Sequence, residues 1–213
     1  MHDFSIHKLG QAVGQYVAKK VSNLERAEYL AFGAEILLGS IVKLCSLFFI
    51  AAMLDIVREV IILLVVTGTI RTLSGGAHCS AYYRCLVTSV SILTVLGYTV
   101  KAIFPLIRQF PTIVLVGIIA LSIYLYWRYA PKAPLNKPFE SRAKEMAFRR
   151  YTLISVVTLS IISIVLGANS LIGWTMVFAL LWQAFTLTSV GHMFIGSWDV
   201  LLTFKKKGGG AEC

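Results

Sequence analysis

Polar and apolar residues alternate along this chain in long blocks. Six apolar segments follow residue 29, each near the roughly 20 residues that a helix needs to cross a bilayer. This pattern predicts an all-α integral membrane protein with about six transmembrane helices. The segments cover about 30–54, 56–73, 86–104, 112–130, 151–167 and 171–190.

The second segment has the weakest apolar signal. Its uninterrupted apolar part covers only residues 60–70, and Arg58 and Glu59 stand at its beginning. It is therefore either a full span or a re-entrant element. Glu35 and Lys43 in the first segment are costly in lipid, so we expect them to face protein or water.

Residues 3–24 show a different, amphipathic pattern. Phe4, Ile6, Leu9 and Val13 fall on one side of a helix, with lysine and glutamine on the others. This pattern favours an amphipathic helix at the membrane interface within the N-terminal region 1–29. A helix packed on a soluble part of the protein is the alternative, but the chain offers little for it to pack on.

The composition agrees with a membrane protein. Of the 213 residues, 57% are hydrophobic and 14% are charged, against about 25% charged in soluble domains. We expect one membrane-embedded domain over 1–204 and a disordered tail over 205–213. The opening residues lack the compact apolar region of a signal peptide, and the spacing of the four cysteines indicates no disulfide framework.

The basic residues predict an orientation. The net charge of +10 is better explained by cytoplasmic loops and anionic lipid than by nucleic acid. If all six segments span, sixteen of the twenty lysines and arginines lie on one side. The positive-inside rule makes that side cytoplasmic, together with both termini and residues 71–85.

A basic loop over 131–150 is the only long polar stretch. Its prolines keep the first half extended, and residues 140–150 are expected to begin a helix. The loop either sets the topology alone or also docks an acidic peptide. In the second interpretation the substrate-binding residues are Lys132, Lys137, Arg142 and Lys144.

The candidate chemistry lies in residues 71–85, R-T-L-S-G-G-A-H-C-S-A-Y-Y-R-C. A thiol near an imidazole can perform nucleophilic catalysis. On one continuous helix, His78 and Cys85 would lie about 10.5 Å apart along the axis, beyond the roughly 2.6–3.2 Å of a hydrogen bond. Gly75 and Gly76 therefore favour a helix break, with His78 on a loop folded over the start of the helix that carries Cys85.

The thiol needs nearby positive charge, because an unperturbed cysteine is only a few per cent thiolate at neutral pH. His78, Arg71 and Arg84 can supply that charge. An acid to orient the imidazole is missing from the motif itself. Glu140, Glu28 and Glu35 remain open for that role.

Other interpretations of the motif have to be weighed. Its small residues suit helix packing around inert thiols. A metal site from His78, Cys79, Cys85 and His192 would have a spacing that fits no common zinc arrangement. For the whole chain, a non-enzymatic transporter or channel and a structural or sensor bundle are the alternatives to an enzyme.

The run R-T-L-S-G-G-A-H followed by cysteine after six residues, with Y-A-P…N-K-P at 129–138, resembles the accessory gene regulator protein B (AgrB) family. The resemblance covers nearly the whole chain. It implies a membrane cysteine endopeptidase of quorum sensing, which cuts the C-terminal part from a propeptide and helps to cyclise the rest as a thiolactone or lactone.

The same resemblance implies roles for individual residues. Cys85 would be the nucleophile and His78 its base, with Arg71, Gly75 and Gly76 in supporting positions and Cys79 incidental. It implies no cofactor or metal, an AgrD-like propeptide as partner, contact with membrane lipid, and a homodimer. The expected location is the plasma membrane of a Gram-positive bacterium.

Overall fold

The computed structural model describes residues 12, 13, 16, 20, 27–77, 79, 82–132, 139 and 141–202. The predicted all-α membrane class is confirmed, since each of the six apolar segments is helical within this part. The predicted tail, 205–213, and all but four residues of the predicted interfacial helix lie outside the described residues. The seven helices of the described part are α2 (Ala27–Met53), α3 (Val57–Ser74), α4 (Tyr82–Ile107), α5 (Thr112–Tyr129), α6 (Arg142–Leu166), α7 (Leu171–Phe185) and α8 (Ser189–Leu201).

Four of these helices contain stretches long and apolar enough to cross a membrane: Gly33–Met53, Tyr83–Ile107, Thr112–Tyr129 and Arg142–Leu166. Helices α7 and α8 form a fifth candidate, bent by 86°. The sequence predicted one segment over 171–190, whereas the structure divides it in two. Helix α3 is continuous over 18 residues, and its crossing of the membrane stays a prediction.

Local capping explains where several helices begin. Ser141 accepts a hydrogen bond from the Lys144 amide at 3.2 Å, Ser170 caps α7, and Thr188 caps α8 through the Gly191 amide at 3.0 Å. Such side chains satisfy amides that the first helical turn leaves open. Because α6 starts at Arg142, the prediction that residues 140–150 begin a helix is confirmed.

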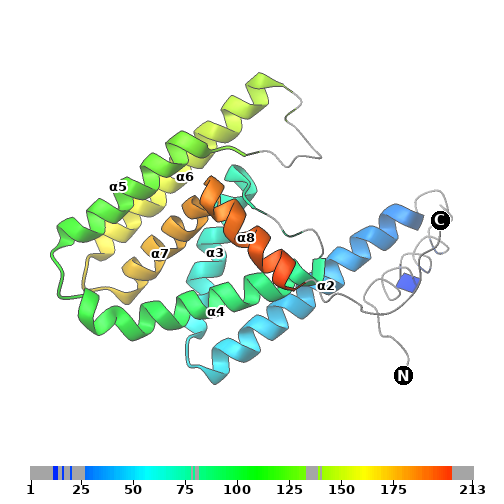
Figure 1. Ribbon diagram of the computed structural model, residues 1–213, viewed down its shortest axis with the longest axis horizontal. Helices are drawn as coiled ribbons and strands as arrows, with labels where there is room; N and C mark the ends of the chain where they lie inside the picture. Colours follow the sequence, from blue (N-terminus) through cyan, green and yellow to red (C-terminus); the bar gives the residue numbers. More distant parts are fainter. Residues whose placement is uncertain are drawn as a thin grey trace. The chain divides into compact units, whose positions relative to one another are not determined.

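Helix α7 is the central element of residues 51–213. It contacts α3, α4, α5 and α6 (Figure 1). Polar groups also join its neighbours to it, since the Tyr126 hydroxyl donates to the Leu180 carbonyl at 3.0 Å. Residues 1–50, with most of α2, form a separate unit of contacts. The core around α7 contains Val100, Ile107, Leu115, Ile119, Trp174 and Val177.

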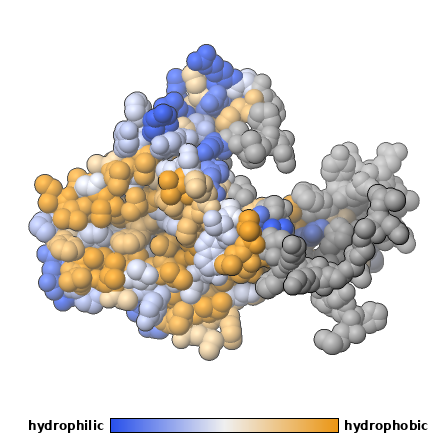
Figure 2. Space-filling model, viewed as in Figure 1, coloured by the Kyte–Doolittle hydropathy of each residue, from blue (hydrophilic) through white to orange (hydrophobic). Residues whose placement is uncertain are grey.

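The outward faces of the helices are apolar, as expected for contact with lipid. Ile113 on α5 is 74% exposed and Val165 on α6 is 80% exposed. Figure 2 shows apolar residues spread over much of this surface, with hydrophilic residues gathered where α6 begins. Since single exposed apolar residues are common but broad apolar surfaces are not, this surface indicates a membrane environment.

The bend between α7 and α8 is tightly packed. Trp182 and Phe185 on α7 face Phe194 on α8, with ring centroids 6.0 Å apart in both pairs. Gly191 lies against the end of α7, and a Cβ there would stand 2.0 Å from the Phe185 carbonyl oxygen. The close approach of α8 to α7 therefore requires glycine at this position.

Gly191→Ala should destabilise the protein, because the added methyl forces α8 away from the main chain of α7. Overpacking of this kind typically costs about 1–3 kcal/mol. The melting temperature of the detergent-solubilised protein should fall. The matched control is Gly196→Ala on the same helix, where a Cβ meets nothing within 4 Å. Equal melting temperatures for the two variants would contradict the described packing of α8.

Candidate active site

The break predicted within the motif is present. Helix α3 ends at Ser74 and α4 begins at Tyr82, so Cys85 lies in the first turn of α4. His78, Ser80 and Ala81 lie outside the described residues. The prediction that His78 and Cys85 do not share one continuous helix is confirmed, while contact between their side chains stays a prediction.

Gly75 is held against the segment that follows α5. Its φ is +74°, a conformation that favours glycine, and its amide donates to the Arg71 carbonyl at 3.0 Å. The Lys132 amide donates to the Ser74 carbonyl at 2.8 Å, and Gly75 and Lys132 form a parallel bridge. A Cβ on Gly75 would lie 2.0 Å from the Lys132 carbonyl oxygen, so a side chain does not fit.

Gly76 lies against the end of α7. Its φ is +146°, and a Cβ would stand 3.0 Å from the Thr186 hydroxyl oxygen. Gln183, only 1% exposed, donates from Nε2 to the Gly75 carbonyl at 2.9 Å and to the Ser74 hydroxyl at 3.4 Å. The two glycines therefore allow the loop main chain to reach a buried amide of α7.

Arg71 holds the far end of the same short loop. Its guanidinium donates to the Ala77 carbonyl, and the Ala77 amide donates to the Thr186 carbonyl at 3.3 Å. Arg71 also lies within electrostatic range of the thiols of Cys85 and Cys79. The supporting positions expected for Arg71, Gly75 and Gly76 thus meet in one hydrogen-bonded loop, residues 75–77.

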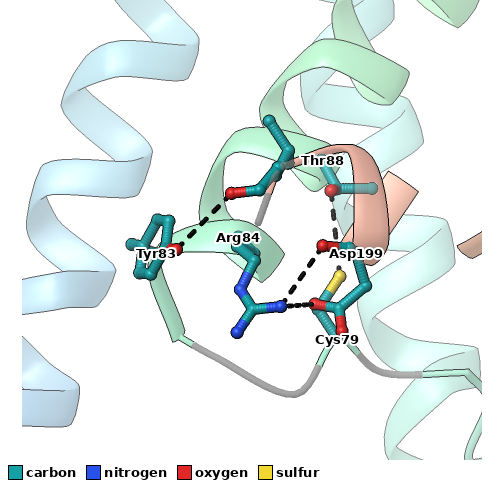
Figure 3. Close-up of polar contacts among 6 residues, drawn as sticks. Cys79, Tyr83, Arg84, Thr88 and Asp199 are labelled. Atoms are coloured by element: carbon teal, nitrogen blue, oxygen red, sulfur yellow. Dashed lines mark hydrogen bonds and ion pairs between the residues drawn. The ribbon is translucent and has the colours of Figure 1, made fainter. Parts of the chain in front are cut away.

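Cys79 is engaged in a contact of its own. Its thiol donates to the Thr88 hydroxyl at 3.7 Å (Figure 3). Burial raises the pKa of the Cys79 thiol, although the hydrogen bond to Thr88 acts in the opposite direction. Burial of Cys79 thus disfavours the thiolate form that a nucleophilic cysteine needs. Cys85 is partly buried and, like Cys79, is a free thiol.

The basic residues named as substrate-binding candidates have different positions. The Lys132 ammonium donates to the Leu187 carbonyl at 3.1 Å, so it holds the bend between α7 and α8. Arg142 and Lys144 are exposed at the start of α6, and Lys137 lies outside the described residues. These positions separate Lys132 from Arg142 and Lys144.

His192 lies on α8, within electrostatic range of Lys132 and Arg71. Its Nε2 is buried and has no hydrogen-bond partner among the described residues. Within that same part of the chain, no group of three histidine, cysteine, aspartate or glutamate side chains is placed to hold a metal ion.

Three acids were considered for orienting His78. Glu140 is outside the described residues, and Glu28 and Glu35 lie on α2, in the first unit.

Three residues that contact the motif region were missed by the sequence analysis: Gln183, Thr186 and Asp199. Gln183 is the only amide side chain in α7, and a polar residue in an apolar segment is a functional candidate by default. Asp199 is the only acidic residue between 146 and 211. It pairs with Arg84 at 3.1 Å. Amide and acidic side chains are scarce in this part of the sequence, and that scarcity could have identified Gln183 and Asp199.

These features define an all-α membrane protein with a partly buried cysteine beside a glycine-containing break between two helices. The chain belongs to the accessory gene regulator B family, whose model matches residues 11–187. An AgrB-like protein of Clostridium perfringens strain SM101 is 26% identical, covering 91% of this chain and 96% of the relative. A second AgrB-like protein, from C. perfringens strain 13, is 25% identical, with coverage of 88% and 95%. No solved structure matches the chain.

Membership of this family implies a role in the accessory gene regulator quorum-sensing system. It also implies a membrane location and an AgrD-like propeptide as partner. The apolar helices agree with a multi-pass membrane protein.

Gly75→Ala should loosen the loop over residues 75–77, because the new methyl collides with the Lys132 carbonyl and φ is unfavourable. Backbone strain of this kind costs about 1–3 kcal/mol. In a protein whose Cys45 and Cys213 are alanine, alkylation of Cys79 should become faster, as measured by mass spectrometry. Gly68→Ala on α3 is the matched control, since a Cβ there meets nothing within 4 Å. Equal alkylation rates in the two variants would rule out the close contact with Lys132.

Proposed function

We propose that the protein is a membrane cysteine endopeptidase that cleaves the C-terminal part of a quorum-sensing propeptide. The enzyme retains the N-terminal part as a thioester on Cys85. It then promotes cyclisation of that part to a thiolactone or lactone. This proposal is more specific than the family's role in quorum sensing, and it assigns the chemistry to His78 and Cys85.

The hydrogen bonds of Ala77 and Cys79, the two sequence neighbours of His78, are the observation that carries the proposal. Ala77 is bonded to α7 through Thr186, and Cys79 is bonded to α4 through Thr88. Ala77 and Cys79 flank residue 78 in the sequence, and consecutive Cα atoms are only 3.8 Å apart. Thr88 stands three residues after Cys85 on α4, about one helical turn away. This placement supports an imidazole close to the Cys85 thiol.

In the proposed reaction, His78 removes the proton from Cys85, and the thiolate attacks the scissile carbonyl carbon of the propeptide. The tetrahedral intermediate collapses as the C–N bond breaks. His78 returns the proton to the departing amine, which leaves with the C-terminal fragment. Arg71, within electrostatic range of the Cys85 thiol, supplies positive charge near the sulfur during the attack.

Ring closure is the second half of the proposed reaction. His78 takes the proton from a cysteine thiol or serine hydroxyl inside the bound peptide as that group attacks the thioester carbonyl. The C–S bond to Cys85 then breaks, and the leaving thiolate recovers the proton from His78. Water would give a linear acid instead, so exclusion of water is required until the ring closes. A partly buried Cys85 at the end of a membrane helix suits this requirement.

Charge outside the site is proposed to guide the substrate. Arg142 and Lys144 are exposed on the first turn of α6 and, with Lys137, would attract an acidic segment of the propeptide. Lys132 is assigned to the site architecture because its ammonium binds the Leu187 carbonyl. The proposal also includes a cytoplasmic active site and termini, as the positive-inside rule predicts, and a homodimer.

A covalent adduct should accumulate when the ring-closing residue of the propeptide is replaced by alanine. Acylation of Cys85 then remains possible, but cyclisation does not. The adduct should carry the N-terminal part of the peptide and be released by hydroxylamine, as thioesters are. Mass spectrometry of the digested enzyme locates it. His78→Ala should slow its formation by the roughly 10²–10⁴-fold that a general base contributes.

Cys85→Ala should abolish the adduct. Cys79→Ser is the matched control, since it removes the second thiol and keeps a hydroxyl that can donate to Thr88. An adduct on Cys79 would refute the assignment of the nucleophile. Cleavage that persists in Cys85→Ala would refute the thioester mechanism as a whole.

A further inference from the structure

The carboxyl end of α8 returns to the first turn of α4. There the Arg84 guanidinium lies 3.1 Å from a carboxylate oxygen of Asp199. The same Arg84 nitrogen donates to the Asp199 main-chain carbonyl at 3.2 Å. Figure 3 shows both contacts next to Cys79 and Thr88. Arg84 immediately precedes Cys85, so this pair acts on the turn that carries the proposed nucleophile.

The Arg84–Asp199 pair is well covered by the protein. The Arg84 side chain is 17% exposed and the Asp199 side chain 18%. Exposed ion pairs contribute little, but burial strengthens the attraction and fixes the geometry. The residue before Arg84 supports the same attachment, since the Tyr83 hydroxyl reaches the Leu202 carbonyl at 3.5 Å. Helix α8 thus holds two consecutive residues of α4.

The pair also separates the roles of two arginines. From the sequence, both Arg71 and Arg84 were expected to favour the thiolate. Asp199 now counters the charge of Arg84, while Arg71 remains within electrostatic range of both thiols. Arg84 is therefore better suited to orient α4 than to stabilise a thiolate. Arg71 is better suited to supply the positive charge near the thiols.

We propose that Asp199 is a positioning residue that acts through Arg84 to fix the α4 turn bearing Cys85. The inference rests on the proposed function of Cys85 as nucleophile. Helix α8 lies beyond residues 11–187, which match the family model, so this attachment adds to what family membership implies. Asp199 contacts Arg84 and does not take part in the bond changes itself.

The test uses the protein with Cys45 and Cys213 replaced by alanine and Cys79 by serine, so that Cys85 is the only thiol. Serine at position 79 keeps a hydroxyl donor for Thr88. Asp199→Asn removes the charge and keeps the size. The rate constant for acylation by saturating propeptide should fall about tenfold or more, since small misplacements of reacting groups are that costly. The KM for the propeptide should stay unchanged. Asp199→Glu should recover part of the lost rate.

A double-mutant cycle asks whether Asp199 acts through Arg84. Arg84→Gln should slow acylation about as much as Asp199→Asn, and the double variant should be no slower than either, because contacting residues are not additive. If the two fold-losses in the acylation rate constant multiply in the double variant, Asp199 acts independently of Arg84 and the proposal is overturned.

The matched control is Asp55→Asn. Asp55 pairs with Lys101 at the other end of α4, at 2.7 Å, with its side chain 98% exposed. Removing this charge should leave acylation at the parent rate. If Asp55→Asn and Asp199→Asn slow acylation equally, the effect is general destabilisation of α4 and the proposal fails.

Alkylation of Cys85 by iodoacetamide gives a second readout that needs no propeptide. Asp199→Asn should change its rate by about threefold or more, since thiol reactivity depends on access and surroundings, and Asp199→Glu should restore it. If the parent forms no adduct but alkylation responds as expected, the proposed function fails and the positioning stands. If the adduct forms on Cys85 and neither rate depends on Asp199, the positioning fails and the proposed function stands.

Discussion

The site depends on hydrogen bonds to the main chain where α3 stops. Away from water, each main-chain amide and carbonyl freed by a helix break needs a partner, because an unsatisfied buried group costs about 1–3 kcal/mol. Gln183 binds the Gly75 carbonyl, Thr186 binds the Ala77 amide, and Arg71 binds the Ala77 carbonyl. With these partners, the loop over residues 75–77 can hold an irregular course beside a membrane helix.

This requirement links the site to the rest of the fold. Gln183 and Thr186 are at the end of α7, which is itself enclosed by α3, α4, α5 and α6. The sharp bend after α7 sends α8 back to α4, where Asp199 meets Arg84. The loop is therefore attached to the end of α7, and the helix of Cys85 is attached to α8. Changes at the bend between α7 and α8 are expected to reach the site.

The sequence was sufficient to predict much of this arrangement. Long apolar blocks indicated the helices, and the pair Gly75 and Gly76 indicated the break, since both patterns follow from local chemistry. The partners of the loop were not predictable in the same way. Gln183 and Asp199 lie 108 and 115 residues from their partners, Gly75 and Arg84, and only the packing of the helices brings them together. The bend after Phe185 was missed because hydropathy reports apolar length and carries no information on direction.

The central claim is that a buried amide of α7 holds the loop next to the proposed catalytic pair, His78 and Cys85. It is tested most directly by Gln183→Met, which keeps the volume but removes the donor to the Gly75 carbonyl. Single-turnover acylation of Cys85 should slow about tenfold or more, because reacting groups are displaced. The control is Thr175→Val, buried on the same helix and bonded only locally to the Leu171 carbonyl, which should acylate at the parent rate. A folded Gln183→Met protein that acylates as fast as the parent would contradict the account.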